Sequence, residues 1–126
     1  MRPGQNPAVI AWITGMSPEH LRMTVVSLHE MQYGIEQLPA GKKRRDLAAG
    51  LGVLIGSGWG ASMLVLDATS AERAAIARAA ALRATGYCDV PDALIAGIAI
   101  ARAASVATRN IKDFRHFGVP LIDPWA

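Results

Sequence analysis

The chain has 126 residues, of which 52% are hydrophobic and 18% charged, and this composition excludes an intrinsically disordered protein. The net charge of +3 agrees with a nucleic-acid ligand or an acidic protein partner but establishes neither. The single cysteine, Cys88, excludes an internal disulfide, so we expect a cytoplasmic protein. We also expect one domain over residues 1–126.

The first part of the chain combines helix and strand patterns. Residues 7–15 predict a short helix, and the β-branched side chains of residues 23–27 predict a buried strand. Residues 28–37 have apolar side chains at the spacing of a core-facing helix. Proline and glycine at residues 39–41 break the chain, and a further helix is predicted to begin with the basic run at residue 42.

Residues 47–66 contain no charged side chain over about the length of a membrane-spanning helix. Five glycines lie within this segment, which favours a helix end, a turn and a new strand over one continuous helix. We therefore expect no membrane segment. A strand is predicted at residues 63–66, and a helix at residues 70–84 that ends at Gly86.

The segment that follows is predicted to form the centre of the domain. Pro91 suits the first turn of a helix, and residues 93–101 are all apolar or glycine, so that this helix must be buried. Residues 105–108 and 119–122 predict two short strands. Strands that alternate with helices in this way predict an α/β domain with a mainly parallel sheet.

Three carboxylates fall where these elements begin or end. Glu30 follows the first predicted strand, Asp92 starts the buried helix, and Asp113 comes shortly after the strand at residues 105–108. Ligands of α/β folds bind outside the carboxyl ends of the strands, and oxygen-only ligand sets suit Mg²⁺ or Mn²⁺. A metal held there could orient water for in-line attack on a phosphodiester.

Each carboxylate also has a structural interpretation. Glu30 stands three residues after Ser27, the spacing of a capping box, and the local sequence favours this cap. The helix dipole favours a carboxylate at Asp92, although partial burial would leave its charge in need of a cation or hydrogen bonds. Asp67 is interpreted as structural, and Asp89 as a turn or surface residue.

The basic run and the histidines are less informative. Four consecutive cations at a helix start oppose the helix dipole, which slightly favours a role in binding phosphate or an acidic segment over a solvated face. The three histidines share no metal-ligand spacing, and we expect them at the surface or with hydrogen-bond partners. They are His20, His29 and His116.

Several short motifs together resemble the PIN-domain ribonucleases of the VapC toxin type, near the FitB-like branch. In chain order they are Thr24-Val-Val-Ser27 with Glu30, Tyr33-Gly34-Ile35, Pro39-Ala-Gly41, Asp67, Val90-Pro-Asp92-Ala-Leu-Ile-Ala, Ala107-Thr-Arg-Asn110, Asp113-Phe114 and Leu121-Ile-Asp-Pro-Trp125. Each motif is weak alone. Their order and spacing over essentially the whole chain are specific.

This resemblance implies a three-layer α/β/α PIN-like domain that acts as a Mg²⁺- or Mn²⁺-dependent endoribonuclease, the toxin of a type II (VapBC-like) toxin–antitoxin system. It implies an RNA substrate, a VapB-like antitoxin, a homodimer and no membrane. Glu30, Asp92 and Asp113 match catalytic and metal-binding carboxylates of the family, so Glu30 can be both a cap and a ligand. The other candidates are Thr108 and Asn110 as supporting residues, and Lys42, Lys43, Arg44, Arg45 and Arg109 as contacts to RNA or antitoxin.

The family's opening motif has no match in this sequence. Members begin with an apolar strand ending in an Asp-Thr-Asn-like motif, which supplies the first metal carboxylate and the centre of the sheet. We therefore expect an N-terminally truncated domain whose first, central strand is missing, either because the start codon is assigned too far downstream or because the chain is a truncated relative. Each backbone group left unpaired in the core would cost on the order of 1–3 kcal/mol, so we predict a poorly folded or inactive 126-residue form and a longer native product.

Two other classes of function remain open. The chain could be a catalytically inactive PIN fold that binds an antitoxin peptide or RNA without cleavage, or an unrelated small α/β ligand-binding domain. Metal-dependent RNA cleavage that Asp92→Asn removes would favour the nuclease. RNA binding that weakens steeply with salt would separate the second class from the third.

Overall fold

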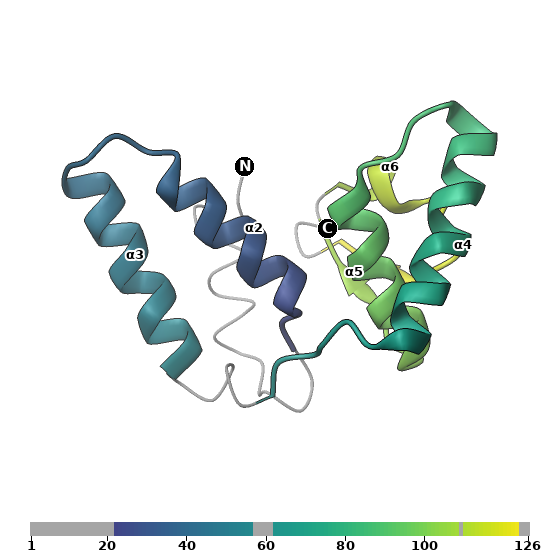
Figure 1. Ribbon diagram of the computed structural model, residues 1–126, viewed down its shortest axis with the longest axis horizontal. Coiled ribbons are helices and arrows are strands. Elements are labelled where there is room, and N and C mark those ends of the chain that lie inside the picture. Colours follow the sequence, from purple (N-terminus) through teal and green to yellow (C-terminus); the bar gives the residue numbers. More distant parts are fainter. Residues whose placement is uncertain (1–21, 57–61, 109, 124–126) are drawn as a thin grey trace.

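The computed structural model describes residues 22–56, 62–108 and 110–123, so the helix predicted at residues 7–15 lies outside the described part. Helices make up most of this part, and two short strands complete it (Figure 1). The elements are α2 (Val25–Glu36), α3 (Lys42–Leu54), α4 (Ala68–Thr85), α5 (Val90–Ala101), β1 (Val106–Ala107), α6 (Ile111–Phe114) and β2 (Leu121–Ile122).

The strand predicted at residues 23–27 is wrong, because α2 already begins at Val25. Thr24 is the N-cap, and its side-chain oxygen accepts a hydrogen bond from the Ser27 N–H at 3.0 Å. Extended backbone remains only at Thr24, which forms an isolated parallel bridge with Leu64. The predicted cap at Ser27 is therefore also wrong. β-Branched side chains favour strands only weakly, and here a helix cap and packing against α5 decide the conformation.

The α/β class and the parallel strand pairing are confirmed, with a sheet that is smaller than predicted. β1 and β2 pair in parallel, with Val106 opposite Leu121 and Ala107 opposite Ile122. The strand predicted at residues 63–66 is reduced to the bridge at Leu64. Few residues thus adopt regular strand conformation in the described part, and the helices provide most of the packing.

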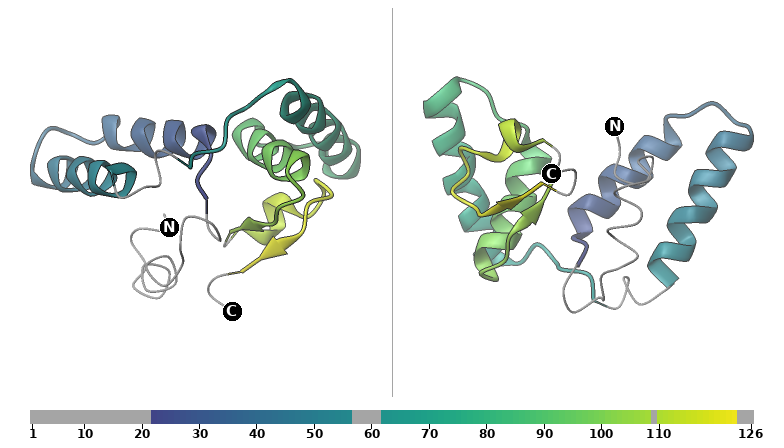
Figure 2. Two further views of the ribbon diagram at one scale, coloured as in Figure 1. Left: turned by 90° about the horizontal axis from the view of Figure 1, so that it is seen from below. Right: turned by 180° about the vertical axis from the view of Figure 1, so that it is seen from behind.

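Helix α5 lies between α4 and the β1–β2 pair, and it also contacts α2 and α6 (Figure 2). The prediction that this helix is buried is confirmed, since Ala96 and Ile98 are fully buried. At the crossing with α4, a Cβ on Gly97 would lie only 2.4 Å from the Ser70 carbonyl oxygen and 2.5 Å from the Ala74 backbone nitrogen. Glycine therefore permits the close backbone approach that fixes this pair.

The ends of α4 agree largely with prediction. Asp67 caps its start, accepting a hydrogen bond from the Ser70 N–H at 2.9 Å, so the structural interpretation of Asp67 is confirmed. The hydrogen bonds from Ser70 also lower the pKa of Asp67. Gly86 ends the helix in the left-handed conformation with φ of 75°.

Helices α2 and α3 form an arm on the other side of the molecule (Figure 1). Residues 39–41 break the chain and Lys42 opens α3, both as predicted. Leu51 is the buried residue of α3 within the described part. None of the described helices is long and apolar enough to cross a membrane.

Candidate functional site

The candidate site is built around the first turn of α5. The Asp89 carboxylate caps this helix and accepts a hydrogen bond from the Asp92 N–H at 2.9 Å. Pro91 lies in the first turn, where no intrahelical donor is needed, so its missing N–H leaves no hydrogen bond unmade. Asp92 is half-buried there because α5 packs against its neighbours.

Asp92 is the electrostatically perturbed residue of the site. Burial raises its pKa, and the negative charges of Asp89, Asp113 and Glu30 raise it further, from 3.8 to about 7. Burial disfavours the ionised form, and nearby like charges act in the same direction. Carboxylates from α2, the α5 cap and α6 therefore act together on one half-buried carboxyl group.

Glu30 lies in the second turn of α2, with 42% of its side chain exposed. The ring nitrogen Nδ1 of His29 donates a hydrogen bond to Glu30 Oε2 at 2.8 Å. His29 also stacks on Tyr33, with nearly parallel rings whose centroids are 6.3 Å apart. One carboxylate oxygen of Glu30 is thus engaged, and Oε1 has no hydrogen-bond partner among the residues that the structure describes.

Asp113 is exposed on the short helix α6, and the two supporting candidates lie just before it. The Thr108 hydroxyl oxygen accepts a hydrogen bond from the Asn110 N–H at 2.9 Å, and the Thr108 N–H donates to the Ile122 carbonyl at 2.9 Å. Thr108 therefore braces the turn that leads from β1 to α6. Asn110 is the N-cap residue of α6, and its side chain makes no capping bond.

The three predicted carboxylates thus share one acidic neighbourhood, but they do not close into a ligand set. Within the described ranges, no group of three His, Cys, Asp or Glu side chains is placed so that it could hold a metal ion. The chemistry of the donors nevertheless fits a hard divalent cation, because all are carboxylate oxygens. A cation there would also offset the burial and the carboxylate repulsion that together raise the Asp92 pKa.

The basic candidates divide into two groups. Lys42 pairs with Asp46 at 2.7 Å, and Arg44 pairs with Glu36 of α2. Lys43 and Arg45 are exposed and form no ion pair with the described residues. These two are therefore the cations of the run best able to contact a phosphate, whereas Arg109 lies outside the described residues.

Sequence reasoning missed two neighbours of the site. The sequence predicts a turn or surface position for Asp89, yet this residue caps α5 and adds its charge next to Asp92. Its position three residues before Asp92 is the usual spacing of an N-cap carboxylate, so that signal was present. The link between His29 and Glu30 has no local sequence signal beyond their adjacency.

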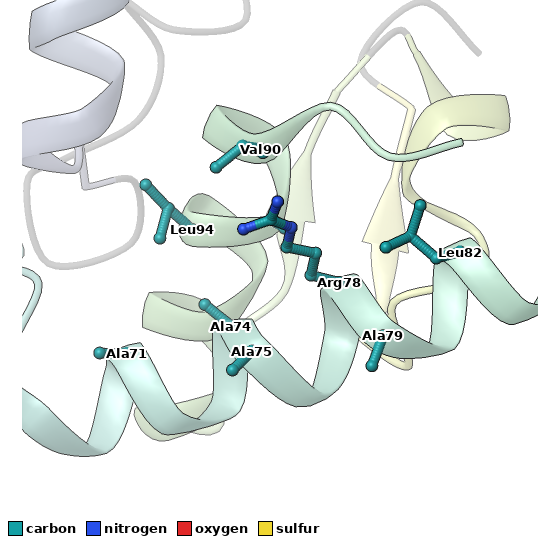
Figure 3. A pocket seen from close by; sticks show the side chains of 9 residues that line it. Ala71, Ala74, Ala75, Arg78, Ala79, Leu82, Val90 and Leu94 are labelled. Atoms are coloured by element: carbon teal, nitrogen blue, oxygen red, sulfur yellow. The ribbon is translucent and has the colours of Figure 1, made fainter. Parts of the chain in front are cut away.

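Two hollows lie near the start of α5. A cavity of about 290 Å³ is lined by residues of α2, α5 and the segment before α4: Val25, Val26, His29, Leu66, Pro91 and Leu94. A larger groove of about 390 Å³ lies between α4 and α5, and Arg78 extends across its alanine-lined floor toward Val90 (Figure 3). None of the predicted site residues lines this larger groove.

Comparisons with known proteins give the family. Plasmid stability protein StbB of Pseudomonas syringae pv. tomato is 32% identical to the chain over 124 residues, which cover 95% of this chain and 86% of StbB. VapC ribonuclease Y4jK of Sinorhizobium fredii is 29% identical, covering 94% of this chain and 84% of the relative. A solved structure of FitAB bound to an IR36 DNA fragment has a TM-score of 0.82 and 27% identity, covering 99% of this chain and 87% of the solved one.

This chain belongs to the VapC/FitB-like family of PIN-domain toxins. No family model matches it. The likeness to FitAB covers almost the whole chain, so the described helices and the small parallel sheet are those of a VapC/FitB-like PIN domain. The fold that the sequence motifs implied is therefore confirmed.

Proposed function

We propose that this chain is a Mg²⁺- or Mn²⁺-dependent endoribonuclease, the toxin of a type II toxin–antitoxin system. The observation that carries the proposal is the acidic neighbourhood around Asp92, to which α2, α5 and α6 each contribute a carboxylate in a VapC/FitB-like fold. The relative named as a VapC ribonuclease supports RNA as the substrate. The FitAB structure supports a partner protein, for which we propose an antitoxin.

Glu30, Asp92 and Asp113 are the residues that would hold the metal. When bound, such an ion orients a water for in-line attack and neutralises charge on the phosphate. Glu30 can present Oε1 while His29 holds Oε2, and Asp92 is fixed by the capped first turn of α5. Asp113 is carried on α6, whose approach from β1 is braced by Thr108.

The basic residues would contact RNA or the antitoxin. Lys43 and Arg45 are exposed and able to contact phosphates, whereas Lys42 and Arg44 would first have to exchange their carboxylate partners. Each phosphate contact releases counterions, so binding should weaken as salt rises. We further propose that the protein is a cytoplasmic homodimer.

The test is cleavage of single-stranded RNA by the full chain with Mg²⁺ or Mn²⁺, compared with EDTA. Asp92→Asn removes the central carboxylate charge and should abolish cleavage. Glu72→Gln is the matched control, because it neutralises an exposed carboxylate on α4 that has no role in the proposed site. Cleavage that persists in Asp92→Asn, or that needs no metal, would contradict the proposal.

A second candidate is a PIN fold that binds RNA or an antitoxin peptide without cleavage. The observation in its favour is that no three candidate ligands of the described part close around a metal position. In this case the folded wild-type chain binds RNA in a salt-dependent way and cleaves none. The same assay, combined with a binding measurement, separates the two candidates.

A further inference from the structure

The smaller cavity adjoins the acidic neighbourhood and is so far without a role. It lies between the first turns of α2 and α5, and its volume of about 290 Å³ is close to the lower limit of small-molecule sites. Five of its six lining residues are apolar, and His29 is the polar one. The cavity is open at the surface, so a ligand could enter directly from solvent.

Two of the lining residues are immediate neighbours of the proposed metal ligands. His29 precedes Glu30 and is hydrogen-bonded to it, and Pro91 precedes Asp92 in the first turn of α5. A group bound in the cavity would therefore lie beside the carboxylates that act on the phosphate. Because the cavity adjoins the proposed reaction centre, a part of the same substrate is the occupant that this position favours.

The ring of His29 makes two contacts within α2, and 74% of the side chain stays exposed. Its Nδ1 donates to Glu30, and the imidazole plane lies within 10° of the Tyr33 ring. A flat ligand fits this combination of a prolyl ring, aliphatic side chains and an imidazole ring.

We propose that the cavity between α2 and α5 binds one unpaired nucleobase of the RNA, next to the phosphate that is cleaved. Proteins recognise single-stranded RNA by splaying bases out and stacking them on aromatic or histidine side chains, as the His29 ring would allow here. This inference rests on the proposed function, since it assigns the cavity to the substrate of the same site. It makes His29 a substrate-binding residue that stacks on the flanking base.

The experiment measures binding of a short, end-labelled single-stranded RNA to the full chain in EDTA, where no metal-dependent cleavage occurs. Each nucleotide in turn is made abasic, and the series is repeated with His29→Ala and His29→Phe. Gln32→Ala is the matched control, because Gln32 is exposed on the same helix and does not line the cavity. Circular dichroism checks that each variant folds.

We expect one abasic position at which the wild-type affinity falls about tenfold, because the stacking contact of that base is lost. His29→Ala should lose the same factor with intact RNA and lose nothing further at that abasic position. His29→Phe, which keeps a ring for stacking, should stay close to wild type. Gln32→Ala should bind as the wild type does.

Other outcomes overturn the inference. If the affinity losses caused by the abasic position and by His29→Ala are additive, the base binds somewhere other than the cavity. If no abasic position changes the affinity, the cavity binds no base. A loss of binding to an antitoxin peptide in His29→Ala, with RNA binding unchanged, would make the cavity a protein contact. RNA cleavage without any base effect contradicts this inference alone, whereas base-dependent binding without cleavage contradicts only the nuclease proposal.

Discussion

The pair α4–α5 and the pair α2–α3 are each two helices joined by a short loop, but they are held together differently. Between α4 and α5 the backbones nearly touch at Gly97, and alanines on both helices are buried. Between α2 and α3 the described contacts include a surface ion pair, Arg44 with Glu36, and Leu51 is the buried residue that α3 contributes. Asp92 belongs to the first pair and Glu30 to the second, so the candidate site joins a closely packed region to a loosely packed one.

The largest expected effect tests the close crossing of α4 and α5. Gly97→Ala places a methyl group 2.4 Å from the Ser70 carbonyl oxygen, so the helices must separate. We expect a loss of about 3 kcal/mol in the free energy of unfolding, measured with urea. Gly50→Ala in α3 is the control, because a Cβ there meets no atom within 4 Å, and it should stabilise by about 0.5–1 kcal/mol. Equal effects of the two substitutions would contradict the difference between the pairs.

The second prediction concerns the charge at the boundary of the two regions. Since the folded-state pKa of Asp92 is raised from 3.8 to about 7, ionisation of this group destabilises the metal-free fold as pH rises through that interval. Asp92→Asn should therefore stabilise the metal-free protein at neutral pH by about 1–2 kcal/mol, a value reduced for the partial exposure of the side chain. At acidic pH, below the usual pKa of an aspartate, the variant should be no more stable than the wild type.

Thermal unfolding in EDTA across this pH range measures the effect. Mg²⁺ should stabilise the wild type and not the variant, because a ligand that binds only the folded state stabilises it. A flat difference between wild type and variant over the whole pH range would show that burial and neighbouring charges do not act on Asp92.

A third, smaller effect tests how α2 begins. Thr24→Ala removes the cap that accepts the Ser27 N–H and should cost about 1 kcal/mol, while Thr24→Ser retains the oxygen and most of the stability. Chemical denaturation measures both variants. If Ser27→Ala were the more damaging change, the capping box read from the sequence would be right instead.

The smallest effect is expected at the ion pair between α2 and α3. Both side chains are partly exposed, so a double-mutant cycle of Arg44→Gln and Glu36→Gln should give a coupling of about 0.5 kcal/mol that decreases with salt. A coupling several times larger would mean that α2 and α3 are held as firmly as α4 and α5.

The sequence predicted the closely packed region better than the loosely packed one, for a physical reason. Residues 93–101 have no polar face, so burial of α5 follows from composition alone, and Pro91 and Gly86 are local signals for a helix start and a helix end. The two valines at the start of α2 predict a strand, because no local pattern indicates their packing against Leu94 and Ile98 of α5.

The same limit applies to the candidate site. The positions of Glu30, Asp92 and Asp113 at element ends predict that they converge. The charges of Glu30 and Asp113 do contribute to the raised pKa of Asp92, after burial and Asp89. How closely the carboxyl oxygens approach depends on the angles between α2, α5 and α6, which no local pattern encodes. The proximity of His29 to Pro91 likewise depends on packing across the two regions.

Helix α5 contacts α2, α4, α6 and β1, so it cannot open without disturbing each of them. Its amide protons should therefore exchange with deuterated solvent only when the whole domain unfolds, whereas those of α3 should exchange through local fluctuations. The backbone that carries Asp92 would then open only as often as the whole domain unfolds. Binding of a ligand between α2 and α5 should slow exchange chiefly in the arm and leave that of α5 almost unchanged.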